Sequence, residues 1–120
     1  MSDGPQVVLR YRDGTTQRAT LVQTDTDREI FHIEEDGNAT EVPFGNLKAV
    51  FFPQTEPDKQ PDQADGSQLA VEFADGEIIR GIAHYNPERN GFFLFPLDRS
   101  KNDRIFVVNS AIMSIEVEKL

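Results

Sequence analysis

The sequence predicts an all-β protein made of two tandem five-stranded small barrels that are related by internal duplication. One observation is a repeat, because residues 9–14 (LRYRDG) are matched 62 residues later by residues 71–76 (VEFADG). A second is that short runs alternate apolar and polar residues between turn signals, as half-buried strands do. A third is that no segment keeps a 3.6-residue apolar period, so we expect little helix.

The first repeat, residues 1–52, should hold five strands. We expect them at residues 7–12, 16–24, 29–34, 40–43 and 48–52. Asp13-Gly14 predicts a tight hairpin turn between the first two strands, because glycine readily adopts the positive φ that such a turn needs. Residues 25–27 and 36–38 predict further turns. Residues 44–47 are too few for an α-helix and suit a single 3₁₀ turn.

The second repeat, residues 68–120, should follow the same order. We expect strands at residues 69–73, 78–84, 91–96, 104–108 and 112–117. Asp75-Gly76 takes the place of the first hairpin turn, residues 86–90 predict a turn, residues 98–103 a loop and residues 109–111 a short turn. After a three-residue insertion the match continues at an offset of 65, which aligns Val42 with Val107 and Val50 with Ile115.

The segment between the repeats, residues 53–67, differs in composition. It holds three prolines and a net charge of −3, and no aliphatic residue larger than Ala64. Such a composition cannot contribute to a packed core. We therefore interpret it as an acidic, proline-rich linker.

Some predicted strands are apolar on both faces, namely residues 49–52, 91–95 and 105–108. A strand in a barrel with one core should alternate, so the second face of these strands needs cover from the other half or from another chain. The candidate interface residues are Phe51, Phe52, Phe92, Phe93, Phe95 and Phe106. The two barrels could thus be separate, packed into one unit, or replaced by a single merged barrel or sandwich that uses strands from both halves.

Composition excludes several classes of protein. The 120 residues contain no Cys, which excludes disulfide scaffolds, Cys-ligated metal sites and thiol catalysis. The net charge of −9 disfavours a nucleic acid or an anionic membrane as partner. No run approaches the roughly 18 apolar residues of a membrane helix, and the first residues lack the apolar part of a signal peptide. We therefore expect a cytoplasmic protein.

Catalytic and metal-binding motifs are also missing from the sequence. It has no Gly-x-Ser-x-Gly, phosphate-loop or dinucleotide-binding motif, so we expect a protein that is not an enzyme and has no cofactor. His32 and His84 lie at nearly equivalent positions of the two repeats, but neither has a second ligand at a recognised spacing. We interpret both as ordinary strand residues, and we expect no metal.

One polar cluster in the second repeat is a candidate ligand site. Tyr85, Asn86 and Arg89 precede one apolar strand, and Asn102 and Arg104 precede or begin the next. If the two loops lie close together, these side chains could bind one small anion or one peptide. The alternative is that they are simply turn residues.

The succession of five short strands with a turn before the last resembles the small barrel of Sm-like and Src-homology-type domains. Sm-like barrels often bind RNA through basic loops, which a chain of charge −9 lacks. PilZ domains, which are also small barrels, bind cyclic di-GMP through Arg-x-x-x-Arg and a later Asp/Asn-x-Ser-x-x-Gly. Here Arg10-x-Arg12 has a different spacing, and residues 98–103 (DRSKND) end in Asp103 where the motif has Gly.

A wider likeness rests on motifs in both repeats. They are Phe73, Asp75, Gly76, Arg80 and Gly81, then residues 85–89 (YNPER), 91–94 (GFFL), 104–111 (RIFVVNSA) and, in the first repeat, 47–52 (LKAVFF). On these the chain resembles an uncharacterised bacterial domain family, often found in proteins of signalling type, with no assigned activity. We expect a non-enzymatic binding or regulatory module that acts through protein–protein interaction, including a possible homodimer. The alternative is a sensor of a small anionic ligand or nucleotide, similar to cyclic di-GMP, at the second-repeat loops.

Overall fold

The computed structural model describes residues 5–53, 66–85, 88, 90–97 and 102–118, and these form ten strands and two 3₁₀ turns. The first half contains β1 (Gln6–Tyr11), β2 (Thr16–Asp25), β3 (Ile30–Glu35), β4 (Asn38–Pro43), η1 (Phe44–Asn46) and β5 (Leu47–Pro53). The second half contains β6 (Ser67–Phe73), β7 (Ile78–Ala83), β8 (Gly91–Pro96), β9 (Asn102–Val108), η2 (Asn109–Ala111) and β10 (Ile112–Glu118). The described residues contain no α-helix, so the all-β class is confirmed.

The strands begin and end within two residues of the positions that the sequence predicts. Gly14 and Gly76 have φ values of 93° and 91°, so both Asp-Gly turns use the backbone region that favours glycine. Both expected short turns before the fifth strands are 3₁₀. The predicted loop at 98–103 differs, because Asn102 and Asp103 already belong to β9, and residues 98–101 lie outside the described residues.

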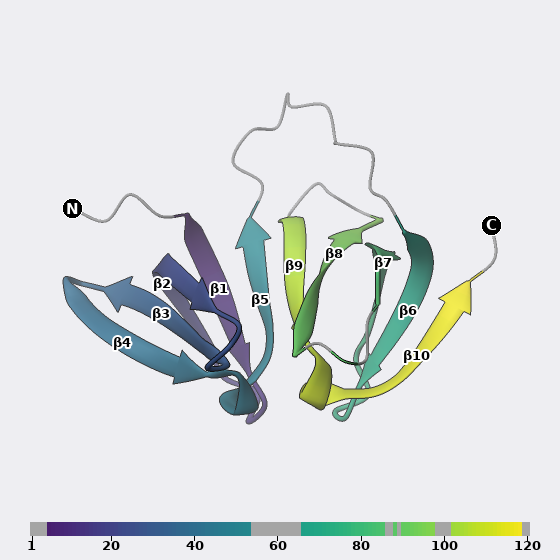
Figure 1. Ribbon diagram of the computed structural model, residues 1–120, viewed down its shortest axis with the longest axis horizontal. Helices are drawn as coiled ribbons and strands as arrows, with labels where there is room; N and C mark the ends of the chain where they lie inside the picture. The colour runs from purple at the N-terminus through teal and green to yellow at the C-terminus, as the bar shows by residue number, and fades with distance from the viewer. Residues whose placement is uncertain (1–4, 54–65, 86–87, 89, 98–101, 119–120) are drawn as a thin grey trace.

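All ten strands form one antiparallel sheet, in the order β10-β6-β7-β8-β9-β5-β1-β2-β3-β4 (Figure 1). Each half has the same internal order, in which the fifth strand lies beside the first and the others follow in sequence. The halves join where β5 pairs with β9. The sheet is not closed, since β10 and β4 are its two ends.

This architecture differs from two separate tandem barrels, and the reason lies in β5 and β9. Side chains alternate between the faces of a strand. In the pair that joins the halves, Val50 is opposite Phe106 and Phe51 is opposite Ile105. All four side chains are buried, so both faces of the junction are covered within the chain. Two of the three apolar strands that needed cover, β5 and β9, therefore receive it from the two halves themselves, whereas β8 keeps Phe93 exposed.

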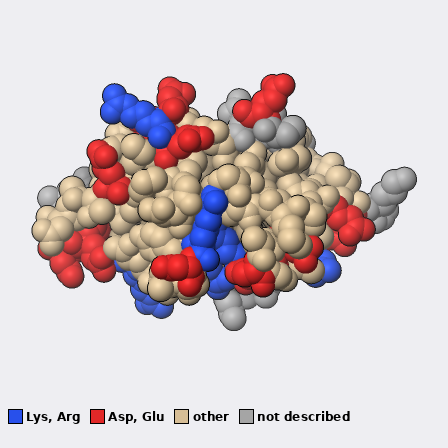
Figure 2. Space-filling view, turned by 90° about the horizontal axis from the view of Figure 1, so that it is seen from below, with Lys and Arg blue, Asp and Glu red and all other residues tan. Residues whose placement is uncertain are grey.

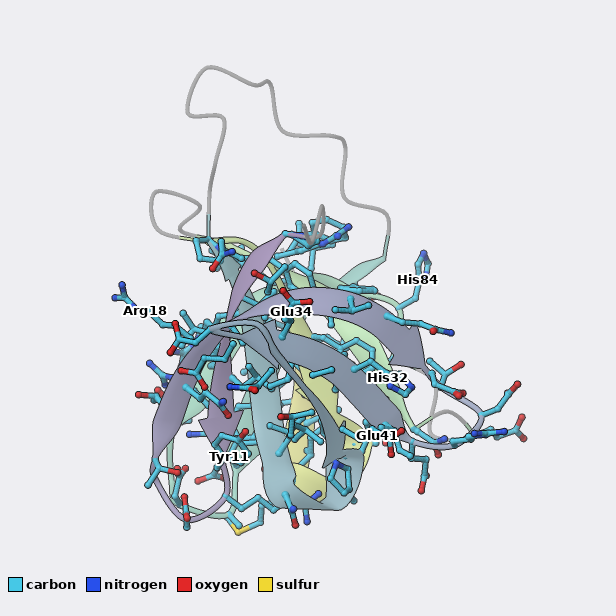
Figure 3. All side chains as sticks on the ribbon, turned by 90° about the vertical axis from the view of Figure 1, so that its left-hand side faces the viewer. Tyr11, Arg18, His32, Glu34, Glu41 and His84 are labelled. Carbon is cyan, nitrogen blue, oxygen red and sulfur yellow. The ribbon has the colours of Figure 1, made fainter. Side chains whose placement is uncertain are left out.

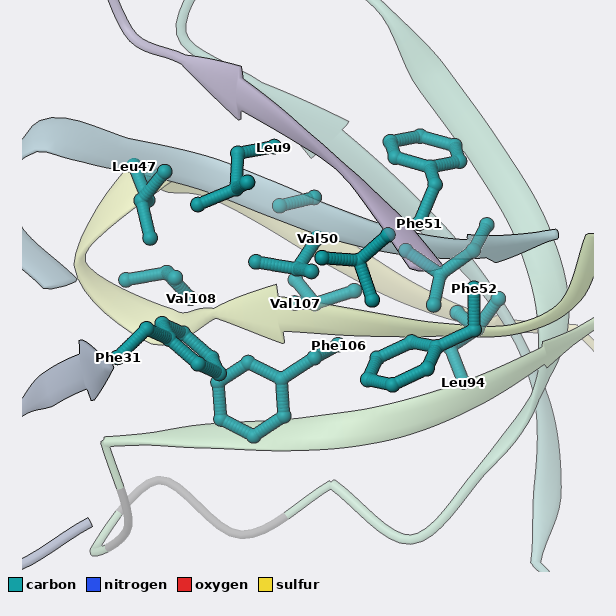
Figure 4. Close-up of a cluster of buried hydrophobic side chains, with 14 of the residues drawn as sticks. Leu9, Phe31, Leu47, Val50, Phe51, Phe52, Leu94, Phe106, Val107 and Val108 are labelled. Carbon is teal, nitrogen blue, oxygen red and sulfur yellow. The ribbon is translucent and has the colours of Figure 1, made fainter. Parts of the chain in front are cut away.

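The aromatic core crosses the junction. The ring centroid of Phe106, in the second half, lies 5.2 Å from that of Phe31 and 5.5 Å from that of Phe44, both in the first half. Phe51 and Phe52 point to opposite sides of β5 (Figure 4). The buried apolar residues of the two halves form one continuous cluster. Neither half completes its core alone.

Candidate functional site

A cluster of charged side chains links β1 and β5 of the first half to the β6–β7 turn of the second half. Lys48, in β5, is only 7% exposed. Its Nζ atom lies 2.7 Å from Oδ2 of Asp75, donates a hydrogen bond to Glu77, and lies 4.9 Å from the centre of the Phe73 ring. Asp75 and Glu77 belong to the β6–β7 connection, where the Asp-Gly turn holds them against β5.

Arg10, in β1, completes this cluster. Its Nη1 atom donates to both carboxylate oxygens of Glu77, at 3.0 and 2.9 Å, and its guanidinium lies 4.5 Å from the centre of the Phe51 ring. Seen from below, basic side chains gather near the middle of the molecule with acidic side chains on either side (Figure 2). The first half thus supplies the cations and the second half supplies the anions.

The pKa values of the two carboxyls reflect these contacts. Burial alone would raise the pKa of Glu77, but hydrogen bonds from Lys48 and Arg10, together with their charges, hold it below 4.5. The hydrogen bond from Lys48 is the main cause that lowers the pKa of Asp75. Both cations are therefore neutralised by carboxylates of the other half, and the cluster is suited to joining the halves rather than to binding an anion.

A second surface lies around Arg104 in β9. The centre of its guanidinium is 4.6 Å from the centre of the Phe52 ring and 4.9 Å from that of Phe93. Phe93 is 39% exposed, and the neighbouring Phe95 and Ile82, which pair across β8 and β7, are half-buried. We call these five residues the Arg104 patch. Within the described part of the chain, Nε of Arg104 is buried without a hydrogen-bond partner.

The structure separates two of the candidate ligand residues. Tyr85 is exposed and its ring centroid lies 5.5 Å from that of Phe92, whereas Arg104 lies against Phe93. Adjacent residues of a strand point to opposite faces, so Tyr85 and Arg104 lie against opposite faces of β8. Asn86 and Arg89 lie outside the described residues, and of Asn102 only the backbone position in β9 is described.

The candidate interface residues fall into two groups. Phe51, Phe52, Phe92 and Phe106 are buried within the chain. Phe93 is exposed and Phe95 is half-buried, so these two retain surface that a partner can contact. Both belong to the Arg104 patch.

The two histidines lie apart. Nδ1 of His32 is 3.8 Å from Oε1 of Glu41 across the β3–β4 pair, and His84 follows the end of β7 (Figure 3). The described residues contain no group of three or more His, Asp or Glu placed to hold a metal ion. Within those same residues, no helix has the length and apolar character needed to cross a bilayer.

The ion-pair cluster is the feature that sequence reasoning missed. Its signal was Lys48, the one charged residue within the apolar run 47–52. A buried lysine needs a counter-charge, and that requirement could have prompted a search for carboxylates elsewhere in the chain. Nothing in the local pattern, however, indicates that those carboxylates come from the second Asp-Gly turn.

Comparison with known proteins gives a family but no activity. A family model described as "Family of unknown function (DUF6982)" matches residues 4–119. No curated protein and no solved structure matches the chain.

Proposed function

Because the chain belongs to the DUF6982 family, whose function is unknown, we propose from its own surface that it is a non-enzymatic binding module and that the Arg104 patch binds a protein partner. The observation that carries this proposal is the guanidinium of Arg104 held against the rings of Phe52 and Phe93.

Arginine is among the residue types most enriched where binding energy concentrates at protein interfaces, and phenylalanine is enriched in the buried centres of those interfaces. The two rings hold the guanidinium in place before a partner arrives, which lowers the conformational entropy that binding must remove. Arg104 forms no ion pair with a carboxylate among the described residues. A partner that offers a carboxylate beside an apolar side chain would complement both the charge and Phe93.

Affinity capture with matched variants tests this function. The wild-type chain, Phe93→Ser and Arg104→Glu would serve as baits in lysate of the source cells, with Val22→Ser as the control because Val22 is 56% exposed in the other half. A specific partner should be retained by wild type and Val22→Ser and lost by both patch variants. Equal recovery by all four baits would overturn the proposal. Circular dichroism of each variant would verify that it is folded.

A sensor of a small anion or nucleotide is the second candidate, favoured by the charge of Arg104, which has no ion pair within the described part of the chain. A ligand that binds only the native state raises the melting temperature by mass action. A thermal-shift panel that includes cyclic di-GMP would support the sensor if a rise occurred in wild type and vanished in Arg104→Ala. Absence of any shift would leave the protein-binding module.

We also infer that the halves arose by duplication of one small-barrel unit of the Sm-like kind. The support is the recurring strand order, the Asp-Gly turn after the first strand of each half, and the 3₁₀ turn before each fifth strand. A cytoplasmic, signalling-related role in bacteria belongs to the same proposal.

A further inference from the structure

The sheet ends at β10, whose outer edge is paired with no other described strand. Along its inner edge β10 pairs with β6 from Ile112 to Glu118, with a register shift between Ile112 and Ser114. Two large apolar side chains of β10 are exposed, Met113 at 61% and Val117 at 63%. Unpaired backbone groups beside exposed apolar side chains make an edge that can accept another strand.

The equivalent strand of the first half is already covered. At the offset of 65 residues, β10 corresponds to β5, with Ile115 at the position of Val50 and Val117 at that of Phe52. Every residue of β5 from 47 to 52 is buried, because β9 pairs with its outer edge, whereas no residue of β10 is buried. The same position in the fold is therefore occupied in one half and open in the other.

The two faces of β10 differ in chemistry. Ile115 pairs with Val71 and Val117 pairs with Leu69. Val71 and Leu69 are fully or almost fully buried, so Ile115 and Val117 lie on the face of β10 that is turned toward the core. Glu116 and Glu118 alternate with them and lie on the opposite face. Glu118 is 3.6 Å from Nε of Arg80, so Glu116 is the more available of the two carboxylates.

We propose that β10 is a second binding site, separate from the Arg104 patch, and that it takes an extended segment of a partner protein in which apolar and basic residues alternate. The pairing of β9 with β5 shows how such a segment could align on β10. A residue opposite Ile115 or Val117 would extend the apolar core, as Phe106 does opposite Val50. A Lys or Arg opposite Glu116 would form the cross-strand charge pair that stabilises neighbouring strands.

A second copy of the chain fits this edge poorly. The only other free edge of the described sheet is β4. At the offset of 65 residues β4 corresponds to β9, and Glu41 corresponds to Phe106. If β4 of a second copy paired with β10 as β9 pairs with β5, Glu41 would lie opposite Ile115. Glu41 would then lie on the core face, and a carboxylate set against the apolar core without a counter-charge is unfavourable. The two acidic edges disfavour pairing between copies and leave β10 available to a basic segment.

A synthetic peptide provides the test. The probe is a short, monomeric peptide in which Lys alternates with Val and Thr, and binding is followed by fluorescence anisotropy at low salt. We expect saturable binding to the wild type and a loss of about tenfold or more in affinity for Glu116→Lys. Glu41→Lys is the matched control, because it makes the same charge change at the other edge, and it should alter affinity by less than about twofold.

A second peptide distinguishes strand pairing from adsorption by charge. Methylation of alternate backbone nitrogens keeps every charge but removes the donors that face β10, so affinity should fall by about tenfold or more. Equal binding of the methylated and unmethylated peptides would overturn the proposal, as would equal effects of Glu116→Lys and Glu41→Lys, or no binding to the wild type. Concentration-dependent dimers of the wild type that the unmethylated peptide dissociates would instead identify a second copy as the occupant.

Discussion

The Nζ atom of Lys48 lies 2.7 Å from Oδ2 of Asp75, which ties the fifth strand of the first half to a turn of the second. The environments of the two groups are unequal, since the side chain of Lys48 is 9% exposed and that of Asp75 is 53% exposed. Water can hydrate the carboxylate if the pair is broken, but it cannot readily hydrate the ammonium.

This asymmetry predicts which partner is costlier to lose. Lys48→Met removes a buried charge and supplies an apolar side chain of similar length, so we expect a loss below about 1 kcal/mol in the free energy of unfolding. Asp75→Asn combined with Glu77→Gln leaves the buried ammonium without a counter-charge and should lower stability more than Lys48→Met. Urea denaturation at neutral pH measures both. The reverse order of stabilities would contradict the role given to the cluster.

The pH dependence of stability follows from Glu77. Its pKa is held below 4.5 although burial opposes this, so its contribution is complete above pH 4.5 and is lost as the pH falls through the folded-state value. We expect the urea midpoint to drop as the pH falls from about 5 to about 3, and to drop less in Glu77→Gln, which cannot titrate at this position. An identical drop in both proteins would exclude a contribution from Glu77.

Removal of the ring of Phe106 should destabilise both halves together. The ring contacts Phe31 and Phe44 across the junction, so Phe106→Ala should cost about 3–5 kcal/mol. Calorimetry should show one transition in wild type and in the variant, because the core is continuous. Val117→Ala, at an exposed position, is the control and should change stability by about 0.5 kcal/mol or less. Two separate transitions would show that the halves unfold independently.

Glycine at position 81 permits a close approach between β7 and β8. A Cβ atom there would lie 2.5 Å from the backbone oxygen of Phe95 and would also meet the side chain of Leu94. Gly81→Ala should therefore cost about 1–3 kcal/mol of stability by thermal unfolding. Gly45→Ala is the matched control, because a Cβ at that position has no atom within 4 Å and should be nearly neutral. Equal melting temperatures for the two variants would contradict this packing.

The local features of the fold could be predicted from the sequence because each depends on a few neighbouring residues. Alternation located the strands, and the Asp-Gly pairs located two hairpin turns whose glycines do adopt positive φ. The relation between the halves could not be predicted in the same way. A run that is apolar on both faces requires cover, but it does not say that β9 will cover β5 in the register that sets Phe106 opposite Val50.

The candidate sites were harder to predict for a related reason. Tyr85 and Arg104 were grouped because their loops could meet, yet each lies against a different ring of two adjacent residues, Phe92 and Phe93. Strand alternation already implied that those rings point apart. Lys48 was visible as an isolated charge, but its partners lie in the other half and are brought to it only by tertiary packing.

The junction between β5 and β9 also makes the protein a candidate for fragment complementation. The contacts that hold the halves together, the strand pairing and the shared aromatic core, are all noncovalent and do not depend on the peptide chain between Pro53 and Ser67. Each fragment alone would expose the rings that the other normally covers, so neither should be stable in isolation. Expressed together as two polypeptides, residues 1–53 and 66–120 should reassemble into one folded unit, so the halves could serve as a split protein.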